Sequence, residues 1–180
     1  MMMEAERSSL LIVDVQDGLA PVMAAPRQVY RGCSLLMRAA NRLDLPVVVS
    51  EQYPKGLGRT VGELLALAPE GAVMEKLHFS CAADTAILTR FQSLGRTQVV
   101  IAGIESHVCV LQSALGFKQE GFDVAVVADA CSSRTEANYH AAMARLAANG
   151  VEVMTVEMVL FEWLHRAGSP EFKDVSALIK

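Results

Sequence analysis

Six short runs rich in apolar residues recur along the chain, and longer segments with a helical pattern separate them. The runs cover residues 9–13, 46–50, 72–74, 97–104, 123–128 and 151–156. Many of their residues are β-branched, and apolar side chains occur on both alternate faces. Such runs are typical of strands that are covered on both sides, as in a parallel sheet.

The segments between the runs carry apolar residues at i, i+3 and i+4 spacing, which predicts amphipathic helices. Thr135 and Gly150 are typical of the two ends of one helix, and Ser169 followed by Pro170 is typical of the start of another. Strand and helix alternate throughout. The pattern therefore predicts one domain over residues 1–180, an α/β protein built as a three-layer α/β/α sandwich around a six-stranded, mainly parallel sheet.

Composition fits a globular protein and excludes several classes of partner. Of the 180 residues, 52% are hydrophobic and 20% are charged, and the net charge is -4. No long Lys/Arg run is present, so we expect no nucleic-acid partner. No apolar run reaches the roughly 18 residues of a membrane span, so we expect no membrane partner. The first seven residues lack the features of a signal peptide, which predicts a cytoplasmic protein.

The four cysteines are widely spaced and form no CxxC motif; they are Cys33, Cys81, Cys109 and Cys131. In a reducing compartment this spacing argues against disulfides and against a zinc site.

The segment 156–164 is unusually apolar for a late helix. It is either part of the core or an interface, and we expect a homo-oligomer, a dimer or larger.

Ligands of open parallel sheets bind at the carboxyl ends of the strands, near the point where the strand order reverses. The residues that follow the first four runs are therefore candidates for a site. We expect chemistry from Asp14, Lys76 and Cys109, and contacts to a small-molecule substrate from four further residues, Gln16, Tyr53, Phe79 and Val108.

The three chemical candidates have the types needed for acyl transfer through a thioester. A thiol attacks as its thiolate, which a helix N-terminus and a nearby cation favour, and Cys109 and Lys76 fit these parts. A carboxylate such as Asp14 could take the thiol proton and return it to a leaving amine. Each residue also has a plain structural alternative. Cys109 could be a small buried thiol, Asp14 could cap a turn, and Lys76 could be a solvated surface lysine.

The segments "LLIVDVQDGL", "EKLHFSC" and "AGIESHVCVLQSAL" resemble the three active-site segments of the isochorismatase-like cysteine hydrolases. This superfamily includes nicotinamidases and N-carbamoylsarcosine amidases. The segments "SEQYPKGLGRTVGEL" and "VVADACSSRTEANYHAAMARLAANGVEVMTVEMVLFEWL" are most similar to the isochorismatase domain-containing subgroup. The resemblance spans nearly the whole chain and implies the strand order 3-2-1-4-5-6.

The resemblance also implies a role for each residue. Asp14 would be the acid and base, Lys76 its electrostatic partner and Cys109 the nucleophile. A cis peptide bond between Ile104 and Glu105 would turn the Glu105 amide inward, to form an oxyanion hole with the Cys109 amide. In that strand order the third strand lies two places from the first, roughly 10 Å away. Lys76 would then reach the site either along its own stem or from an inward-curling loop.

Differences between this sequence and members of the superfamily reduce the number of candidate functions. Nicotinamidases bind a metal through an Asp and two His after the second strand, whereas residues 51–56 contain no histidine, so we expect no metal and no cofactor. Isochorismatases proper lack the cysteine. The prediction is a cysteine hydrolase that cleaves a C–N bond of a small amide or ureide through a Cys109 thioester. The alternative is a catalytically silent, thiol-bearing binding or scaffold protein. A nucleotide-binding domain is weaker, because no GxGxxG follows the first run.

Overall fold

Six parallel strands form one sheet in the computed structural model, which describes residues 1–179, and their order is β3-β2-β1-β4-β5-β6. The strands are β1 (Ser8–Val13), β2 (Val47–Gln52), β3 (Val73–Lys76), β4 (Gln98–Ile104), β5 (Asp123–Ser132) and β6 (Glu152–Met154). Every pairing between these strands is parallel. The predicted architecture and strand order are confirmed.

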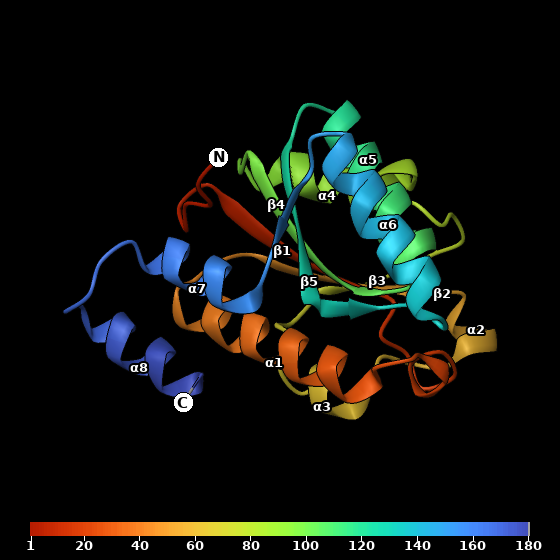
Figure 1. The fold of residues 1–180 in the computed structure, drawn as a ribbon, viewed down its shortest axis with the longest axis horizontal. Helices are drawn as coiled ribbons and strands as arrows, with labels where there is room; N and C mark the ends of the chain where they lie inside the picture. Colours follow the sequence, from red (N-terminus) through yellow and green to blue (C-terminus); the bar gives the residue numbers. More distant parts are fainter. Residues whose placement is uncertain (180) are drawn as a thin grey trace.

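Helices cover both faces of the sheet (Figure 1). One layer contains α1 (Pro26–Arg42), α3 (Gly62–Leu65), α7 (Val156–Leu164) and α8 (Pro170–Leu178), and the other contains α4 (Thr85–Ser93), α5 (Leu111–Gln119) and α6 (Glu136–Ala148). Shorter turns are η1 (Ala20–Val22), α2 (Pro54–Leu57), η2 (Cys81–Ala83) and η3 (Ser106–Val110). Among residues 1–179, no helix combines the length and apolar character that crossing a membrane requires.

The central strands are buried on both faces, as the apolar runs predicted. In β1, Leu10 and Ile12 pack into the core cluster on the α1 side, while Leu11 and Val13 pack into the cluster on the α5 side. The two edge strands differ from that expectation, since β3 and β6 are only partly buried. Each has a neighbour on one side only, which leaves part of its surface exposed to solvent.

Three strands extend beyond the apolar runs that predicted them. β2 continues to Gln52, β3 continues to Lys76 and β5 continues to Ser132. Gln52 and Lys76 are paired in register across β2 and β3. Polar residues at these strand ends interrupt the hydrophobic pattern, although the backbone pairing continues through them. The added residues lie at the carboxyl edge of the sheet.

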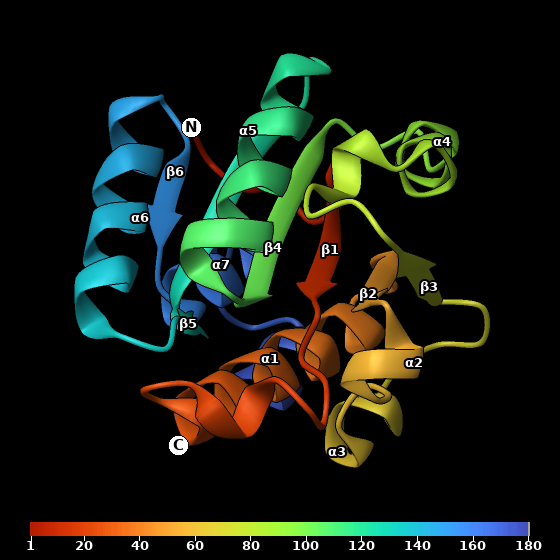
Figure 2. The same ribbon diagram turned by 90° about the vertical axis from the view of Figure 1, so that its right-hand side faces the viewer.

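Gly103 allows β1 and β4 to approach each other closely at this edge. Its φ angle is +121°, and a Cβ atom built on it would lie 2.2 Å from the carbonyl oxygen of Val13. Figure 2 shows β1 and β4 side by side at the centre of the sheet, with α5 along β4. The glycine thus permits the contact that brings the residue after β1 near the loop after β4.

We expect Gly103→Ala to lower the free energy of unfolding by about 3 kcal/mol or more, because the new methyl group meets backbone in addition to an unfavourable φ. The control is Gly121→Ala, since Gly121 has a φ of +88° but no atom lies within 4 Å of the position that a Cβ would take. It should cost only about 1–2 kcal/mol. Urea denaturation of both variants checks the difference, and equal losses would contradict the close-approach argument.

Candidate active site

Asp14 follows the central strand β1 and is fully buried. Its φ angle is +52°, in the left-handed region that Asp tolerates better than most residues. Its Oδ1 accepts a hydrogen bond from Ser50 Oγ at 2.7 Å, and its Oδ2 accepts one from Lys76 Nζ at 2.7 Å. Both carboxylate oxygens are therefore held in place by side chains from β2 and β3.

Lys76 is the last residue of β3, two strands away from β1 in the sheet. Its ammonium group donates to Asp14 Oδ2 and, also at 2.7 Å, to Gln52 Oε1. The side chains of Lys76 and Asp14 are both 0% exposed. Of the two routes considered for Lys76, the structure shows the first. The residue lies at the end of strand β3, and its long side chain reaches Asp14 across β2.

Cys109 lies in η3, the helical turn that leads from β4 into α5. It is 6% exposed, whereas Cys33, Cys81 and Cys131 are exposed by 1% or less. Its thiol lies close enough to Asp14 and Lys76 for both charges to act on it. The structure therefore brings Asp14, Lys76 and Cys109 together at the carboxyl edge of the sheet.

The resting charge state differs from the expectation that the lysine and the helix start favour a thiolate. Burial raises the pKa of the Cys109 thiol, the Asp14 charge raises it further, and Lys76 offsets only part of this. The reason is that the charge of Lys76 is already matched by Asp14 at 2.7 Å. Cys109 therefore rests as a thiol, with the negative charge on Asp14.

The Asp14–Lys76 pair has the properties of a base held beside its counter-ion. Burial raises the pKa of the Asp14 carboxyl, and Lys76 lowers it by less. Burial lowers the pKa of Lys76, but Asp14 and the neighbouring thiols raise it above its ordinary value. Lys76 is thus protonated, and the Asp14 carboxylate is a stronger base than an exposed one.

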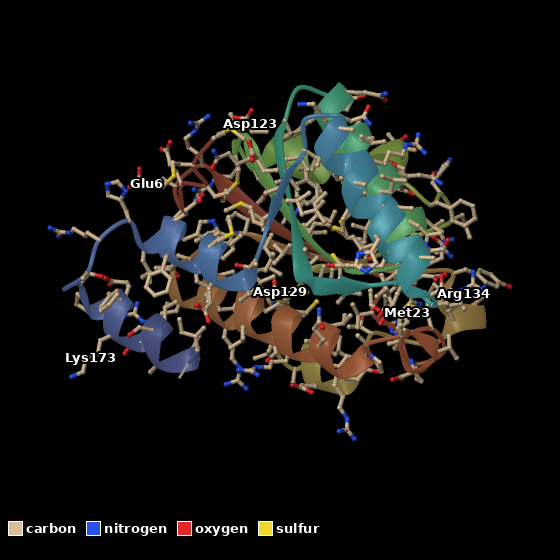
Figure 3. The ribbon with its side chains drawn as sticks, viewed as in Figure 1. Glu6, Met23, Asp123, Asp129, Arg134 and Lys173 are labelled. Atoms are coloured by element: carbon tan, nitrogen blue, oxygen red, sulfur yellow. The ribbon has the colours of Figure 1, made fainter. Side chains whose placement is uncertain are left out.

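The loop before Cys109 offers a backbone donor. The Ile104–Glu105 peptide bond is cis, as the resemblance implied. The Glu105 amide takes part in none of the hydrogen bonds formed by the described residues 1–179. The Glu105 carboxylate is engaged elsewhere, since its Oε2 accepts from the backbone N–H of Arg134 at 3.2 Å and from its Nε at 3.1 Å. Figure 3 shows Arg134 at the carboxyl end of β5, opposite the Asp123 end.

His107 is not paired with the thiol. Its Nδ1 lies 3.0 Å from Ser133 Oγ, and the same nitrogen lies 4.0 Å from Glu105 Oε2. His107 instead joins η3 to the start of the β5–α6 connection.

The predicted substrate contacts lie in different environments. Gln16 is fully buried, and its amide donates to the carbonyls of Gln52 and Gly58 and accepts from the Gln52 N–H. These bonds hold the end of β2 and the loop that follows it, and a contact from Gln16 to a substrate stays a prediction. Tyr53 and Phe79 are about half exposed, and Val108 is partly buried.

A cavity of about 420 Å³ has Lys76 in its lining, but neither Asp14 nor Cys109. It is formed by the connections that follow β2 and β3, with Tyr53, Lys76 and His78 in its lining. Phe79 and Val108 are not part of that lining, so their contacts to a substrate remain predictions.

Two residues that bond to Asp14 and Lys76 had no role assigned to them from the sequence. Ser50 and Gln52 supply the remaining direct bonds to Asp14 and Lys76. A serine inside an apolar run, two residues before a glutamine at the strand end, was the available signal. Glu51 between them points elsewhere, since its Oε1 accepts from the N–H and hydroxyl of Thr60 at 2.7 and 2.8 Å.

No group of three or more His, Cys, Asp or Glu side chains within residues 1–179 is arranged to hold a metal ion. A reaction without a metal or other cofactor stays a prediction. Glu51, the one carboxylate residue in the segment 51–56, binds other groups: its Oε1 accepts from the Thr60 N–H, and Arg59 Nε lies 3.2 Å from its Oε2.

The sheet order and the cluster at its carboxyl edge define a doubly wound α/β protein with a site at the point where the strand order reverses. The profile of the isochorismatase domain matches residues 8–158. The secreted isochorismatase effector Isc1 of Phytophthora sojae is 38% identical over 179 residues, which cover 96% of this chain and 84% of that protein. The chain belongs to the isochorismatase family.

Solved structures agree. A Caenorhabditis elegans protein described as MAR1 ribonuclease has a TM-score of 0.93 and 32% identity, and the match covers 99% of this chain and 92% of that one. The YcaC gene product of Escherichia coli, described as an octameric hydrolase of unknown specificity, has a TM-score of 0.90 and 26% identity, with 99% and 87% covered. The fold is therefore that of the isochorismatase-family hydrolases.

Lys76→Met should lower the free energy of unfolding by about 3–5 kcal/mol, because it leaves the Asp14 charge buried without a partner. The control is Arg42→Met, which removes an ion pair of the same 2.7 Å length to Asp174 on the surface. That loss should be at most about 1 kcal/mol. Urea denaturation measures both. Equal losses would show that the buried pair is not the structural anchor that the geometry indicates.

Asp14→Asn should make Cys109 more reactive towards iodoacetamide at neutral pH. Removing the Asp14 charge lowers the pKa of the thiol, since Lys76 then acts on it unopposed. Each unit by which the pKa falls raises the thiolate fraction at neutral pH about tenfold. Peptide mapping over a range of pH gives the rate, and Asp123→Asn at the far end of β5 is the control. A slower or unchanged rate in Asp14→Asn would contradict the assigned charge state.

Proposed function

We propose that the chain, acting as one isochorismatase-like domain, is a cysteine hydrolase that cleaves a C–N bond of a small amide or ureide through a thioester on Cys109. The observation that carries this proposal is the buried meeting of a thiol, a carboxylate and an ammonium group. A base held against its counter-ion beside a thiol has few structural uses, because burying charge is costly.

Charge balance explains how the thiol is activated. The candidate active site holds one positive charge, on Lys76, and one negative charge that either Asp14 or Cys109 can carry. Moving the Cys109 proton to Asp14 transfers the negative charge from oxygen to sulfur without changing the net charge of the site. Lys76 remains close enough to stabilise either anion.

The thiolate then attacks the acyl carbon of the substrate. A carbon–sulfur bond forms, and the carbonyl oxygen gains a negative charge that the amides of Glu105 and Cys109 can stabilise. Asp14 returns its proton to the substrate nitrogen, and the carbon–nitrogen bond breaks to release the amine.

Water completes the cycle. Asp14 takes a proton from a water molecule, whose oxygen attacks the thioester carbon. The carbon–sulfur bond breaks, a carboxylic acid leaves, and the proton on Asp14 restores the Cys109 thiol. Ser50 and Gln52 keep the carboxylate and the ammonium group in position through their 2.7 Å hydrogen bonds.

A binding or scaffold protein of the same fold is the alternative, and its thiol would show no turnover.

We also propose assembly into a homo-oligomer in the cytoplasm. In α7, Met158 and Phe161 are nearly half exposed while Leu160 and Trp163 lie in the core, so the helix has an apolar face left for a second copy. The octameric description of the Escherichia coli relative supports this assembly.

A screen of small amides and ureides, with RNA as a separate arm, should yield a substrate that the protein hydrolyses to a carboxylate. Cys109→Ala should then lower kcat by about 10³-fold or more, and Asp14→Asn should remove most activity, because both groups act in the chemical step. Cys131→Ala, which changes another buried thiol, is the control and should stay active. Steady-state rates with EDTA present give the measurement.

Two outcomes would contradict the proposal. If Cys109→Ala keeps the wild-type kcat on the substrate found, the covalent route is wrong and a hydrolysis without cysteine is the better account. If RNA alone is turned over, the assigned bond type is wrong.

A further inference from the structure

A second thiol, Cys81, lies beside the candidate nucleophile and has no part in the proposed hydrolysis. It opens η2, the short turn between β3 and α4, and it is 0% exposed. Cys81 and Cys109 belong to the same buried cluster on the α5 side of the sheet. All four cysteines are free in this structure.

The turn that carries Cys81 packs along one face of α5, the helix that follows the Cys109 turn. Ser113 and Gly116 lie three residues apart in α5, so they share one side of that helix. The Cys81 N–H donates to Ser113 Oγ at 2.8 Å. A Cβ atom on Gly116 would lie 2.9 Å from Ala82 Cβ, so the turn and the helix are in close contact.

The Cys81 thiol faces the same charged groups as Cys109. Burial and the Asp14 charge raise its pKa to about 11, while Lys76 and hydrogen bonds with Ser113 and Ser50 lower it by less. Ser50 is also the residue that donates to Asp14 Oδ1 at 2.7 Å. Cys81 in turn raises the pKa of Cys109, and both thiols act on Lys76. Two thiols thus adjoin one Asp–Lys pair.

We propose that Cys109 and Cys81 are an oxidation site, at which hydrogen peroxide converts the two thiols into a reversible disulfide that blocks the nucleophile. The proposal rests on the reactivity assigned to Cys109 in the proposed function. The expected absence of disulfides concerns the reduced protein and is compatible with it.

The chemistry balances in two steps. The Cys109 sulfur, whose proton passes to Asp14, attacks one peroxide oxygen. A sulfur–oxygen bond forms, the oxygen–oxygen bond breaks, and the departing hydroxide takes the proton from Asp14 to become water. The Cys81 sulfur then attacks the Cys109 sulfur. The disulfide bond forms, the sulfur–oxygen bond breaks, and the hydroxide takes the Cys81 proton to become a second water.

Burial favours this order of events. Cys109, at 6% exposure, is the thiol that a small oxidant can reach, and Cys81 is enclosed where it meets only the oxidised Cys109. An internal thiol at high effective concentration competes well with a second peroxide, so it limits oxidation to the irreversible sulfinic acid.

Trypsin separates the cysteines, which makes the test direct. Cys81 falls in residues 77–90, Cys109 in 97–118, Cys33 in 32–38 and Cys131 in 119–134. After limited peroxide treatment at neutral pH and blocking of free thiols, mass spectrometry should find 77–90 joined to 97–118. Dithiothreitol should restore iodoacetamide labelling of Cys109 nearly completely in the wild type.

Cys81→Ala and Cys81→Ser should lose this protection, so that peroxide drives Cys109 to the sulfinic acid and dithiothreitol no longer restores labelling. The internal control is the pair Cys33 and Cys131: Cys131 raises the pKa of Cys33, but no Asp–Lys pair acts on either thiol. Their peptides should stay unlinked. Linkage of Cys33 to Cys131 at the same rate would overturn the proposal, as would equal irreversible oxidation of Cys109 in the wild type and both Cys81 variants.

The readout needs no substrate, so it separates this proposal from the proposed function. A linked Cys81–Cys109 peptide from a protein that hydrolyses nothing would support the oxidation site and count against the hydrolase. Hydrolysis through Cys109 without any linkage would support the hydrolase and refute the oxidation site.

Discussion

The buried ion pair between Lys76 and Asp14 is the interaction on which the site depends. Two charges with no solvent exposure are stable only when their geometry is good and their remaining hydrogen-bonding positions are filled. Ser50 and Gln52 each add one hydrogen bond to the pair from the intervening strand. The pair therefore links the carboxyl ends of β1, β2 and β3, and it fixes the base that the chemistry requires.

The fold supplies the other half of the site by bringing β4 against β1. Gly103 permits the close approach, and the chain then turns through Glu105 into the helical segment of Cys109. Because the thiol adjoins a pair whose charges already cancel, it rests protonated and is activated by transfer of its proton to Asp14. Two features that each look costly, a buried ion pair and a buried thiol, thus act as one unit.

Much of the fold and part of the candidate site could be predicted from the sequence. The apolar runs predicted the strands, and the quoted motifs predicted the strand order, which are confirmed. The bonds of Ser50 and Gln52 were not readable, because one sequence shows neither which side chains meet across strands nor how far β2 and β3 extend past their apolar runs. The hydrogen bonds of Gln16 were not readable for the same reason, since its partners are backbone groups of Gln52 at the end of β2 and of Gly58. The charge state of Cys109 depended on the distance between Asp14 and Lys76.

The most direct test of the central claim is the intact mass of the protein, quenched with acid during turnover of a substrate found by screening. The account predicts an added acyl group, located by peptide mapping on Cys109 within residues 97–118 and absent from Cys109→Ala. Turnover with no adduct on Cys109, under conditions in which hydrolysis of the thioester is slower than formation of the thioester, would contradict it.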